Sequence, residues 1–384
     1  MSISAPDAQA VHRRAIIVDG HCDTPYRLFR HNVHLDEHDT EAQADLRSLQ
    51  EGGVTASFFA AYVPPFYAGR GAADFARRLI ALVHEEARRR PDALVHCTDS
   101  AGIRAAKRDA KLALMIGVEG GHAIEDSLDI LRELYASGAR YLTLTHVNTN
   151  NWCDSSGDAP RHGGLTDFGR EVVRTMNDLG MIVDISHVSD AAFFHVVETT
   201  RVPVVATHSS CRALCRHPRN MTDDMLRALA QNGGVCMINF FSAFIDDEVA
   251  QVIMKAQRRP KQPDAGGGGT EELPDDRTDW DTYLQWFQTL GCPTATLEQV
   301  ADHIFHVADV AGIDHVGIGS DFDGVPALPE GLTTAAGLPA LTARLMERGM
   351  RAEDVEKVLG GNFLRVFEAI ERGARGSTPA RDPA

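Results

Sequence analysis

The sequence has no run of about 18 apolar residues, so we expect no membrane-spanning helix. Residues 1–10 are small and polar and contain no apolar segment of the kind found in signal peptides. Cysteine is scarce: there are seven, an odd number, with no CxxC pair among them. We therefore expect reduced thiols, a cytoplasmic location and no membrane partner.

Basic residues are also few. The chain carries 38 Lys and Arg against 54 Asp and Glu, a formal net charge of −16 at pH 7. Proteins that bind nucleic acid or anionic membranes need clusters of basic residues to hold the phosphates. We therefore expect neither kind of partner. An acidic small molecule is not excluded, because one well-placed arginine can outweigh the global charge.

The 384 residues are 43% hydrophobic, which is enough to bury a large core. Short apolar runs alternate with segments of helical periodicity along most of the chain. The runs that we expect to be strands are 16–18, 54–63, 112–118, 141–145, 181–185, 203–207, 234–239 and 315–320. The segments that we expect to be helices are 40–51, 72–89, 99–108, 128–137, 168–179, 190–198, 223–231, 280–289, 297–311 and 352–369.

Eight strands, each followed by helical sequence, predict an α/β protein with a parallel sheet closed as a (β/α)8 TIM barrel. A doubly wound open sheet is the structural alternative. That fold carries a GxGxxG motif after its first strand, and the motif is absent here. We expect a single barrel domain over 1–373 and a disordered tail over 374–384.

A segment of about 242–296 follows the seventh predicted strand and interrupts the alternation. It contains four consecutive glycines at 266–269. We interpret the segment as an insertion in a loop, and a lid near the site and a disordered surface loop are equally compatible with it. The apolar helical pattern of 352–369 predicts core packing rather than a partner interface.

Polar residues follow several of the predicted strands. His21 and Asp23 come directly after the first strand, and residues i and i+2 of an extended chain point to the same side. Each such residue alone is weak evidence for a site. Ionisable groups gathered at one barrel mouth are costly, however, unless a divalent metal neutralises them. The candidate residues at the strand ends are His21, Asp23, Glu119, His146, His187, His208 and Asp321.

The number of candidate ligands suggests two metal ions. Three carboxylates and three or four imidazoles exceed the four-coordinate shell of one zinc ion. A carboxylate such as Glu119 could bridge the two ions. Two bridged ions can hold a hydroxide for hydrolysis. We therefore expect a barrel with a binuclear site at the C-terminal ends of its strands.

Five strings of this sequence, in this order, resemble the membrane (renal) dipeptidase family, peptidase family M19 of the amidohydrolase superfamily. The resemblance covers roughly residues 14–370, and it is specific because independent strings match. The strings are VDGHCD at 18–23, GVEGGH at 117–122, LTLTH at 142–146, DISH at 184–187 and GSDFDGV at 319–325.

The resemblance implies a dipeptidase with two Zn2+ ions per chain. One ion would take His21, Asp23 and Glu119, and the other would take Glu119, His187 and His208. Glu119 would also be catalytic, because it bridges the ions.

Three further roles follow from the resemblance. His146 would bind the substrate and stabilise the oxyanion, Arg219 would hold the free carboxylate of the substrate, and Asp321 would accept a proton from water and pass it to the leaving amine. His122 and Asp184 are expected to support the ligands, and Asp323 to have a structural or supporting role.

Two departures from the family pattern bear on substrate preference and location. Asn148 stands where the exported, disulfide-linked relatives have a cysteine. Phe241 stands where those relatives have a tyrosine, so a phenol that could help to bind the substrate carboxylate is missing.

The preferred side chains, the acceptance of a C-terminal D-residue and a homodimer stay open. A binuclear amidohydrolase acting on another small amide, such as an N-acyl amino acid, is the alternative function. A barrel without catalysis, serving as a binding protein, predicts missing ligands, and all five ligand positions are filled.

Overall fold

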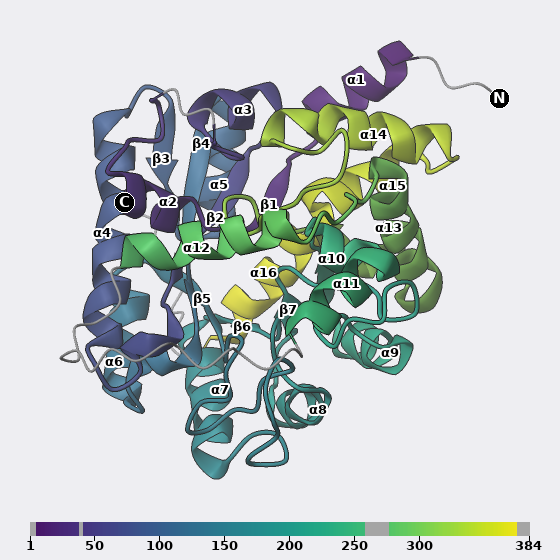
Figure 1. Ribbon diagram of the computed structural model, residues 1–384. Coiled ribbons are helices and arrows are strands. Elements are labelled where there is room, and N and C mark those ends of the chain that lie inside the picture. Colours follow the sequence, from purple (N-terminus) through teal and green to yellow (C-terminus); the bar gives the residue numbers. More distant parts are fainter. Residues whose placement is uncertain (1–4, 38–40, 258–275, 375–384) are drawn as a thin grey trace.

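The computed structural model describes residues 5–37, 41–257 and 276–374. Nine strands form one parallel sheet in this part of the chain, and eight of them close into a barrel because β2 pairs with both β1 and β4 (Figure 1). The barrel strands are β1 (Val18–Cys22), β2 (Ala56–Tyr62), β4 (Leu112–Glu119), β5 (Ala139–Thr143), β6 (Ile182–Asp184), β7 (Val205–Ala206), β8 (Val235–Ile238) and β9 (Val316–Ile318). The predicted (β/α)8 barrel is confirmed.

Each of the eight barrel strands overlaps a predicted one, although β1 begins only at Val18, where the run predicted over 16–18 ends. The sequence did not predict β3 (Leu94–His96), which pairs with β4 outside the barrel. This strand is only three residues long, and only the first of them, Leu94, is buried.

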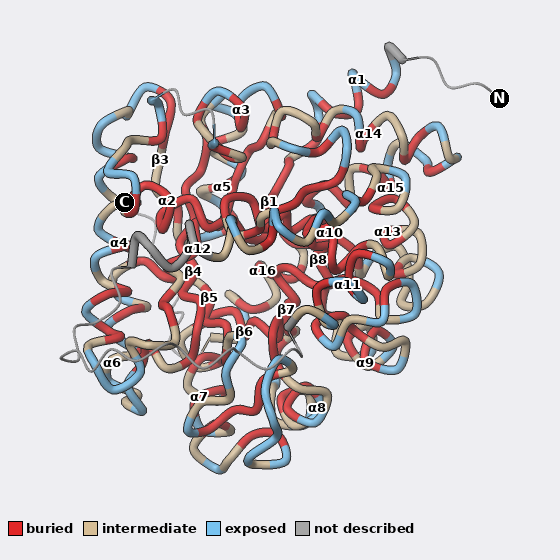
Figure 2. The backbone as a smooth tube through the Cα atoms, viewed as in Figure 1, coloured by how far each residue is buried: buried red, intermediate tan, exposed pale blue. Residues whose placement is uncertain are grey.

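Helices surround the barrel, and the strands and inward helix faces are buried while the outward faces are exposed (Figure 2). The helices are α1 (Ala5–Arg14), α2 (Thr24–His31), α3 (Leu46–Glu51), α4 (Ala72–Arg89), α5 (Ser100–Arg108), α6 (Leu128–Ala136), α7 (Asp167–Leu179), α8 (Asp190–Thr199), α9 (Asp223–Asn232), α10 (Ser242–Ile245), α11 (Asp247–Gln257), α12 (Asp276–Thr289), α13 (Leu297–Ala311), α14 (Leu338–Glu347), α15 (Ala352–Glu356) and α16 (Asn362–Gly373). Short turns of 3-10 or π geometry are η1 (Pro65–Tyr67), η2 (Gly121–Ile124), η3 (Ile313–His315), η4 (Ala335–Gly337) and η5 (Lys357–Gly361).

Most predicted helices are present, with one clear difference in extent. The helix expected over 40–51 begins only at Leu46, because Asp45 forms a capping box with Ser48 and so fixes the start of α3. The sequence did not predict α1, α2, α10, α11 or α14.

The interior of the barrel is filled by large side chains that meet the C-terminal helix. The ring of Phe58 lies 5.2 Å from that of Tyr141 and 5.4 Å from that of Phe363 on α16. Gly360 approaches the start of β1 so closely that a Cβ there would lie 2.3 Å from the Ile16 carbonyl oxygen. The chain end therefore closes the N-terminal end of the barrel, and the core role predicted for 352–369 is confirmed.

Within the described residues, the insertion contributes the helices α10, α11 and α12. The glycine run at 266–269 and the predicted tail, apart from Ala374, lie outside the described residues. The helix expected over 280–289 is confirmed, although it begins earlier, at Asp276. In Figure 1, α12 (green) crosses in front of β1 and β2, and it contacts α2.

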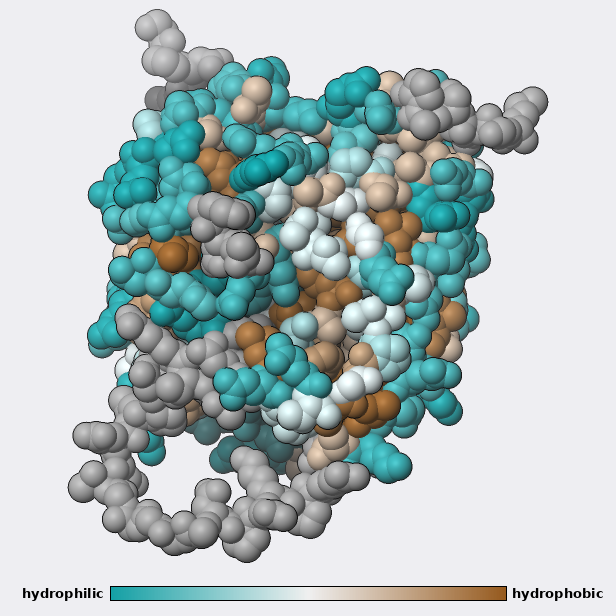
Figure 3. Space-filling view, turned by 45° about the horizontal axis from the view of Figure 1, so that its top comes forward, coloured by the Kyte–Doolittle hydropathy of each residue, from teal (hydrophilic) through white to brown (hydrophobic). Residues whose placement is uncertain are grey.

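Hydrophilic residues cover much of the face drawn in Figure 3, with hydrophobic side chains gathered in patches between them. In the part of the chain that the structure describes, every helix is too short or too polar to cross a lipid bilayer. All seven cysteines are described, and all are free thiols, as expected.

One buried histidine should make stability depend on pH. His303 on α13 is 1% exposed; its Nδ1 accepts from the Cys211 amide at 3.0 Å and its Nε2 donates to the Ile245 carbonyl at 3.0 Å. Burial lowers its pKa from 6.5 to about 4. Between these values the unfolded chain holds a proton that the native state lacks. The contribution of neutral His303 to the free energy of unfolding is therefore complete above pH 6.5. As the pH falls toward 4, this contribution, about 3 kcal/mol, is lost.

We expect His303→Gln to flatten the fall in unfolding free energy between pH 7 and 4.5, measured by urea denaturation. His306→Gln, on the same helix but partly exposed, is the control and should keep the wild-type slope. Any effect of bound metal on the unfolding free energy is the same in wild type, His303→Gln and His306→Gln. Equal slopes in wild type and His303→Gln would contradict the assignment.

Candidate active site

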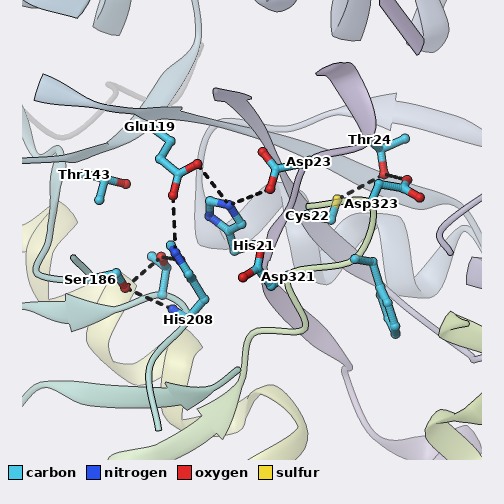
Figure 4. Close-up of polar contacts among 12 residues, drawn as sticks. His21, Cys22, Asp23, Thr24, Glu119, Thr143, Ser186, His208, Asp321 and Asp323 are labelled. Carbon is cyan, nitrogen blue, oxygen red and sulfur yellow. Dashed lines mark hydrogen bonds and ion pairs between the residues drawn. The ribbon is translucent and has the colours of Figure 1, made fainter. Parts of the chain in front are cut away.

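Glu119, the last residue of β4, is the centre of a buried cluster at the C-terminal ends of the strands (Figure 4). Its Oε1 lies 3.1 Å from Nε2 of His187 and 3.3 Å from Nε2 of His208. Its Oε2 lies 3.6 Å from Nε2 of His21, and His146 Nε2 is 3.9 Å from Oε1. Four imidazoles from four different strand ends therefore face one carboxylate.

Two more carboxylates join the cluster. Asp23 Oδ2 lies 3.4 Å from His21 Nε2, and Asp321 accepts a hydrogen bond from Asn239 Nδ2 at 2.8 Å. Asp321 has a positive φ of 64°, a conformation that is costly for a non-glycine residue and recurs at functional sites. Among the residues that the structure describes, three groups have ligand atoms within 4.8 Å of one another: His21, Glu119 and His208; Glu119, His146 and His187; His21, Asp23 and Asp321.

The structure thus brings together every predicted metal ligand, together with His146 and Asp321. The grouping differs in detail from the one that the resemblance implies. His208 lies with His21 and Glu119, and His146 completes the group around His187. The Nε2 atoms of His187 and His208 nevertheless lie 3.0 Å apart, so both can face one ion beside Glu119.

Hydrogen bonds behind His208 fix its tautomer. The Thr207 hydroxyl donates to the Asp184 carboxylate at 2.8 Å, so its oxygen accepts from His208 Nδ1, also at 2.8 Å. The proton of the imidazole is then on Nδ1, and the lone pair of Nε2 faces the oxygen of Glu119. Two lone pairs at this distance repel each other unless a proton or a metal ion lies between them, and a metal ion would satisfy both.

The protonation states of the cluster also favour a metal site. Burial lowers the pKa of His146, His187 and His208 well below the usual range, and Arg219 contributes to this. Burial raises the pKa of Glu119 well above its ordinary value and that of Asp321 to about 6. Buried atoms without a hydrogen-bond partner among the described residues include His21 Nε2 and Asp23 Oδ1. Neutral imidazoles, buried carboxylates and these unpartnered atoms fit divalent metal ions.

The direction of the pKa shift of His21 is set by the nearby carboxylates rather than by burial. Burial alone would lower its pKa, but the carboxylates of Glu119 and Asp23 outweigh burial and raise it to about 10. Its Nδ1 lies 2.8 Å from the hydroxyl of Tyr141, so Nε2 is directed at the carboxylates. The sequence did not point to Tyr141, since a tyrosine within a strand resembles an ordinary core residue.

The structure agrees with the supporting roles predicted for Asp184 and Asp323 but not with the role predicted for His122. Asp184 accepts from the hydroxyls of Thr143 and Thr207 and from two backbone amides, which agrees with a role behind His208. Asp323 accepts from Thr24, Arg27 and the Gln43 amide and therefore ties loops together. His122 instead lies 3.3 Å from the Pro64 carbonyl, so it supports the chain after β2.

Arg219 is a buried cation behind His208. Its guanidinium donates to the Ser209 hydroxyl at 3.0 Å and to the His208 carbonyl at 2.8 Å, and it lies 5.4 Å from the ring centre of Phe244. Burial lowers its pKa to about 10, against the charges of Asp321 and Glu119. Its Nε has no hydrogen-bond partner among the described residues.

A cavity of about 370 Å³ opens above the cluster. Its floor is polar and its walls are largely aromatic or apolar. The lining residues are Asp23, Tyr26, Tyr62, Pro64, Glu119, His146, Val147, His187, Phe241, Phe244, Tyr283, Asp321, Asp323, Gly324, Val325 and Pro326. The volume suits a small molecule.

Comparison with known proteins identifies the family. A sequence profile of membrane dipeptidase (peptidase family M19) matches residues 6–380. The chain belongs to the membrane dipeptidase family. Dipeptidase verJ of Clonostachys rogersoniana is 35% identical to it over 373 residues, which are 92% of this chain and 84% of the relative. This family member is therefore a peptide-bond hydrolase, a dipeptidase, as the sequence motifs predicted.

Solved structures of similar proteins share the barrel. The probable dipeptidase PvdM from Pseudomonas aeruginosa has a TM-score of 0.80 at 26% identity, covering 96% of this chain and 99% of that one. A metallo peptidase from Rhodobacter sphaeroides, solved with a phosphinate mimic of the dipeptide L-Ala-D-Ala, has a TM-score of 0.75 at 24% identity, covering 93% of this chain and 99% of that one.

We expect Tyr141→Phe to weaken the binding of an added divalent metal ion by roughly 10- to 100-fold, the usual effect of losing a partner behind a ligating imidazole. The ring would stay packed against Phe58, so the change removes only the contact with His21 Nδ1. Competition with a chromogenic chelator measures the affinity. Tyr135→Phe, where Arg140 covers the ring, is the control. Equal affinities of Tyr141→Phe and wild type would mean that the hydroxyl does not orient His21.

Proposed function

We propose that this protein is a zinc-dependent dipeptidase that recognises the free carboxylate of its substrate through Arg219. The observation that carries the proposal is the position of this buried guanidinium. It donates to the carbonyl of His208, a residue of the ligand cluster, and it lies 5.4 Å from the ring centre of Phe244, which lines a cavity of dipeptide size. A buried cation with a free donor in its fork favours an anionic partner.

The residues proposed to hold two zinc ions are His21, Asp23 and Glu119 for one, and Glu119, His187 and His208 for the other. When bound, the ions lower the pKa of water so that a nucleophile exists at neutral pH, and they polarise the scissile carbonyl. Glu119 is catalytic in the sense that it joins the two halves of the cluster through its two oxygens.

His146 and Asp321 would act on the substrate itself. The ring of His146 packs at a tilt against Tyr62 and His187, with ring centres 4.8 and 4.4 Å away, at the rim of the cluster. We assign to it the binding of the scissile carbonyl and the stabilisation of its developing oxyanion. Asp321 would accept a proton from the attacking water and deliver it to the leaving amine, while Asn239 orients its carboxylate.

The stereochemistry of the C-terminal residue is a matter for a substrate panel. The Rhodobacter metallo peptidase was solved with a mimic of L-Ala-D-Ala, so L-Xaa-D-Xaa dipeptides belong in the panel beside L-Xaa-L-Xaa ones. N-acyl amino acids carry the same carboxylate but no free amine. Cleavage of these compounds alone would replace the dipeptidase by an acyl-amino-acid hydrolase.

We expect Asp321→Asn to abolish turnover of dipeptides and to leave the metal content near the wild-type value, which we expect to be two ions per chain. The reason is that a carboxamide cannot accept the proton from water, whereas the five proposed ligands remain. Elemental analysis and kcat are the measurements. Loss of one ion would make Asp321 a ligand, in line with its place beside His21 and Asp23, and retention of most of kcat would remove its role as base.

We expect wild type to cleave a dipeptide faster than its C-terminal amide by roughly 30-fold to several-thousand-fold in kcat/KM. A buried charge left without its partner costs about 2–5 kcal/mol, which corresponds to this range. Arg219→Ala should lower activity on the acid and leave the amide almost unchanged, so the two substrates and two proteins form a double-mutant cycle.

Arg216→Ala is the matched control for Arg219→Ala, because the exposed Arg216 pairs with Asp247 on the surface. This variant should keep the wild-type preference. If wild type cleaves the dipeptide and its C-terminal amide equally well, Arg219 does not bind the substrate carboxylate.

A further inference from the structure

The cavity has one wall from a helix that lies outside the barrel repeat. Tyr283 of α12 lines the cavity together with Phe241 and Phe244, which follow β8. In Figure 1, α12 crosses the barrel between the region of α2 and that of α10. A residue of the insertion therefore reaches the same space as the catalytic cluster.

Packing holds Tyr283 at this wall. Tyr283 and Phe287 are four residues apart and so lie on one face of α12. Phe287 is buried, and its ring centre lies 6.2 Å from that of Phe241. Trp286 stacks on Tyr283 with ring centres 5.7 Å apart. The helix is thus seated on the aromatic side chains that follow β8, and Tyr283 is directed at the cavity.

The neighbours of Tyr283 link it to the C-terminal half of a bound dipeptide. The Phe244 ring that packs against Phe241 at 5.0 Å also lies under the guanidinium of Arg219. On the other side, burial raises the pKa of Tyr283 and the charge of Asp321 raises it further, so the phenol remains a hydrogen-bond donor near Asp321. Asp321, assigned to the leaving amine, lines the cavity together with Tyr283, and so does Phe244, which lies under the carboxylate-binding Arg219. Tyr283 therefore shares a cavity wall with groups assigned to the C-terminal half of the substrate.

We propose that Tyr283 is a specificity-determining residue, whose phenol donates a hydrogen bond to the carboxylate of the C-terminal residue of the dipeptide. It supplies the donor that Phe241 cannot provide, and it does so from a different element of the fold. This assignment rests on the proposed function, because it takes Arg219 and Asp321 as the ends of the same half of the substrate.

The test compares four proteins on one dipeptide and its C-terminal amide: wild type, Tyr283→Phe, Phe241→Tyr/Tyr283→Phe and the control Tyr135→Phe. For Tyr283→Phe we expect KM for the acid to rise roughly 10- to 100-fold, as for a lost hydrogen bond to a charged group, with kcat within about twofold. The amide should be nearly unaffected. The double variant should recover most of the loss, because it returns a phenol to the same aromatic wall.

The outcomes separate this inference from the proposed function. If wild type cleaves the acid but Tyr283→Phe has the wild-type KM, the phenol is not a donor to the substrate and the inference fails alone. A loss that is equal on acid and amide, without recovery in the double variant, assigns Tyr283 to packing and also overturns the inference. If wild type cleaves no dipeptide, the proposed function fails and this inference fails with it.

Discussion

Glu119 imposes the constraint on which the rest of the site depends. A carboxylate at the mouth of a closed barrel, with imidazoles of His21, His187 and His208 facing it within 3.6 Å, cannot be balanced by solvent. Burial pushes His187 and His208 toward neutrality and Glu119 toward protonation, while the carboxylates hold the pKa of His21 high, so the cluster lacks positive charge beside its carboxylates. Divalent cations satisfy this requirement, and hydrolysis of a polarised amide is the chemistry that such ions support.

The barrel core and the site are parts of one packed structure. Tyr141 fills the barrel interior against Phe58 and at the same time contacts Nδ1 of His21. Its ring is accommodated because position 117 is glycine: a Cβ there would lie 1.9 Å from the Tyr141 ring. Gly319 has a similar part near Thr207, whose carbonyl a Cβ would approach to 1.8 Å. Ligand orientation is therefore set by interior packing as well as by the ligands themselves.

The residues that line the cavity and the candidate metal ligands come from different parts of the fold. The metal-ligand candidates come from strand ends, whereas the walls of the cavity come from loops and from α12 of the insertion. Such walls can vary without disturbing the cluster, because the strands alone hold the ligand candidates. This separation is typical of barrel enzymes, in which the loops change specificity on a constant scaffold.

The sequence by itself determined the eight barrel strands and the candidate ligands, because buried strands leave apolar runs and the ligands follow them directly in the chain. It determined the family through short strings around these ligands. Only the tertiary structure decided which distant residues support them, such as Tyr141 behind His21 and Thr207 behind His208. Only the structure brought Tyr283 to the cavity, since it lies on a helix whose position no local pattern encodes. The physical reason is that periodicity reports which face of an element is buried, whereas its neighbours depend on how the whole chain closes.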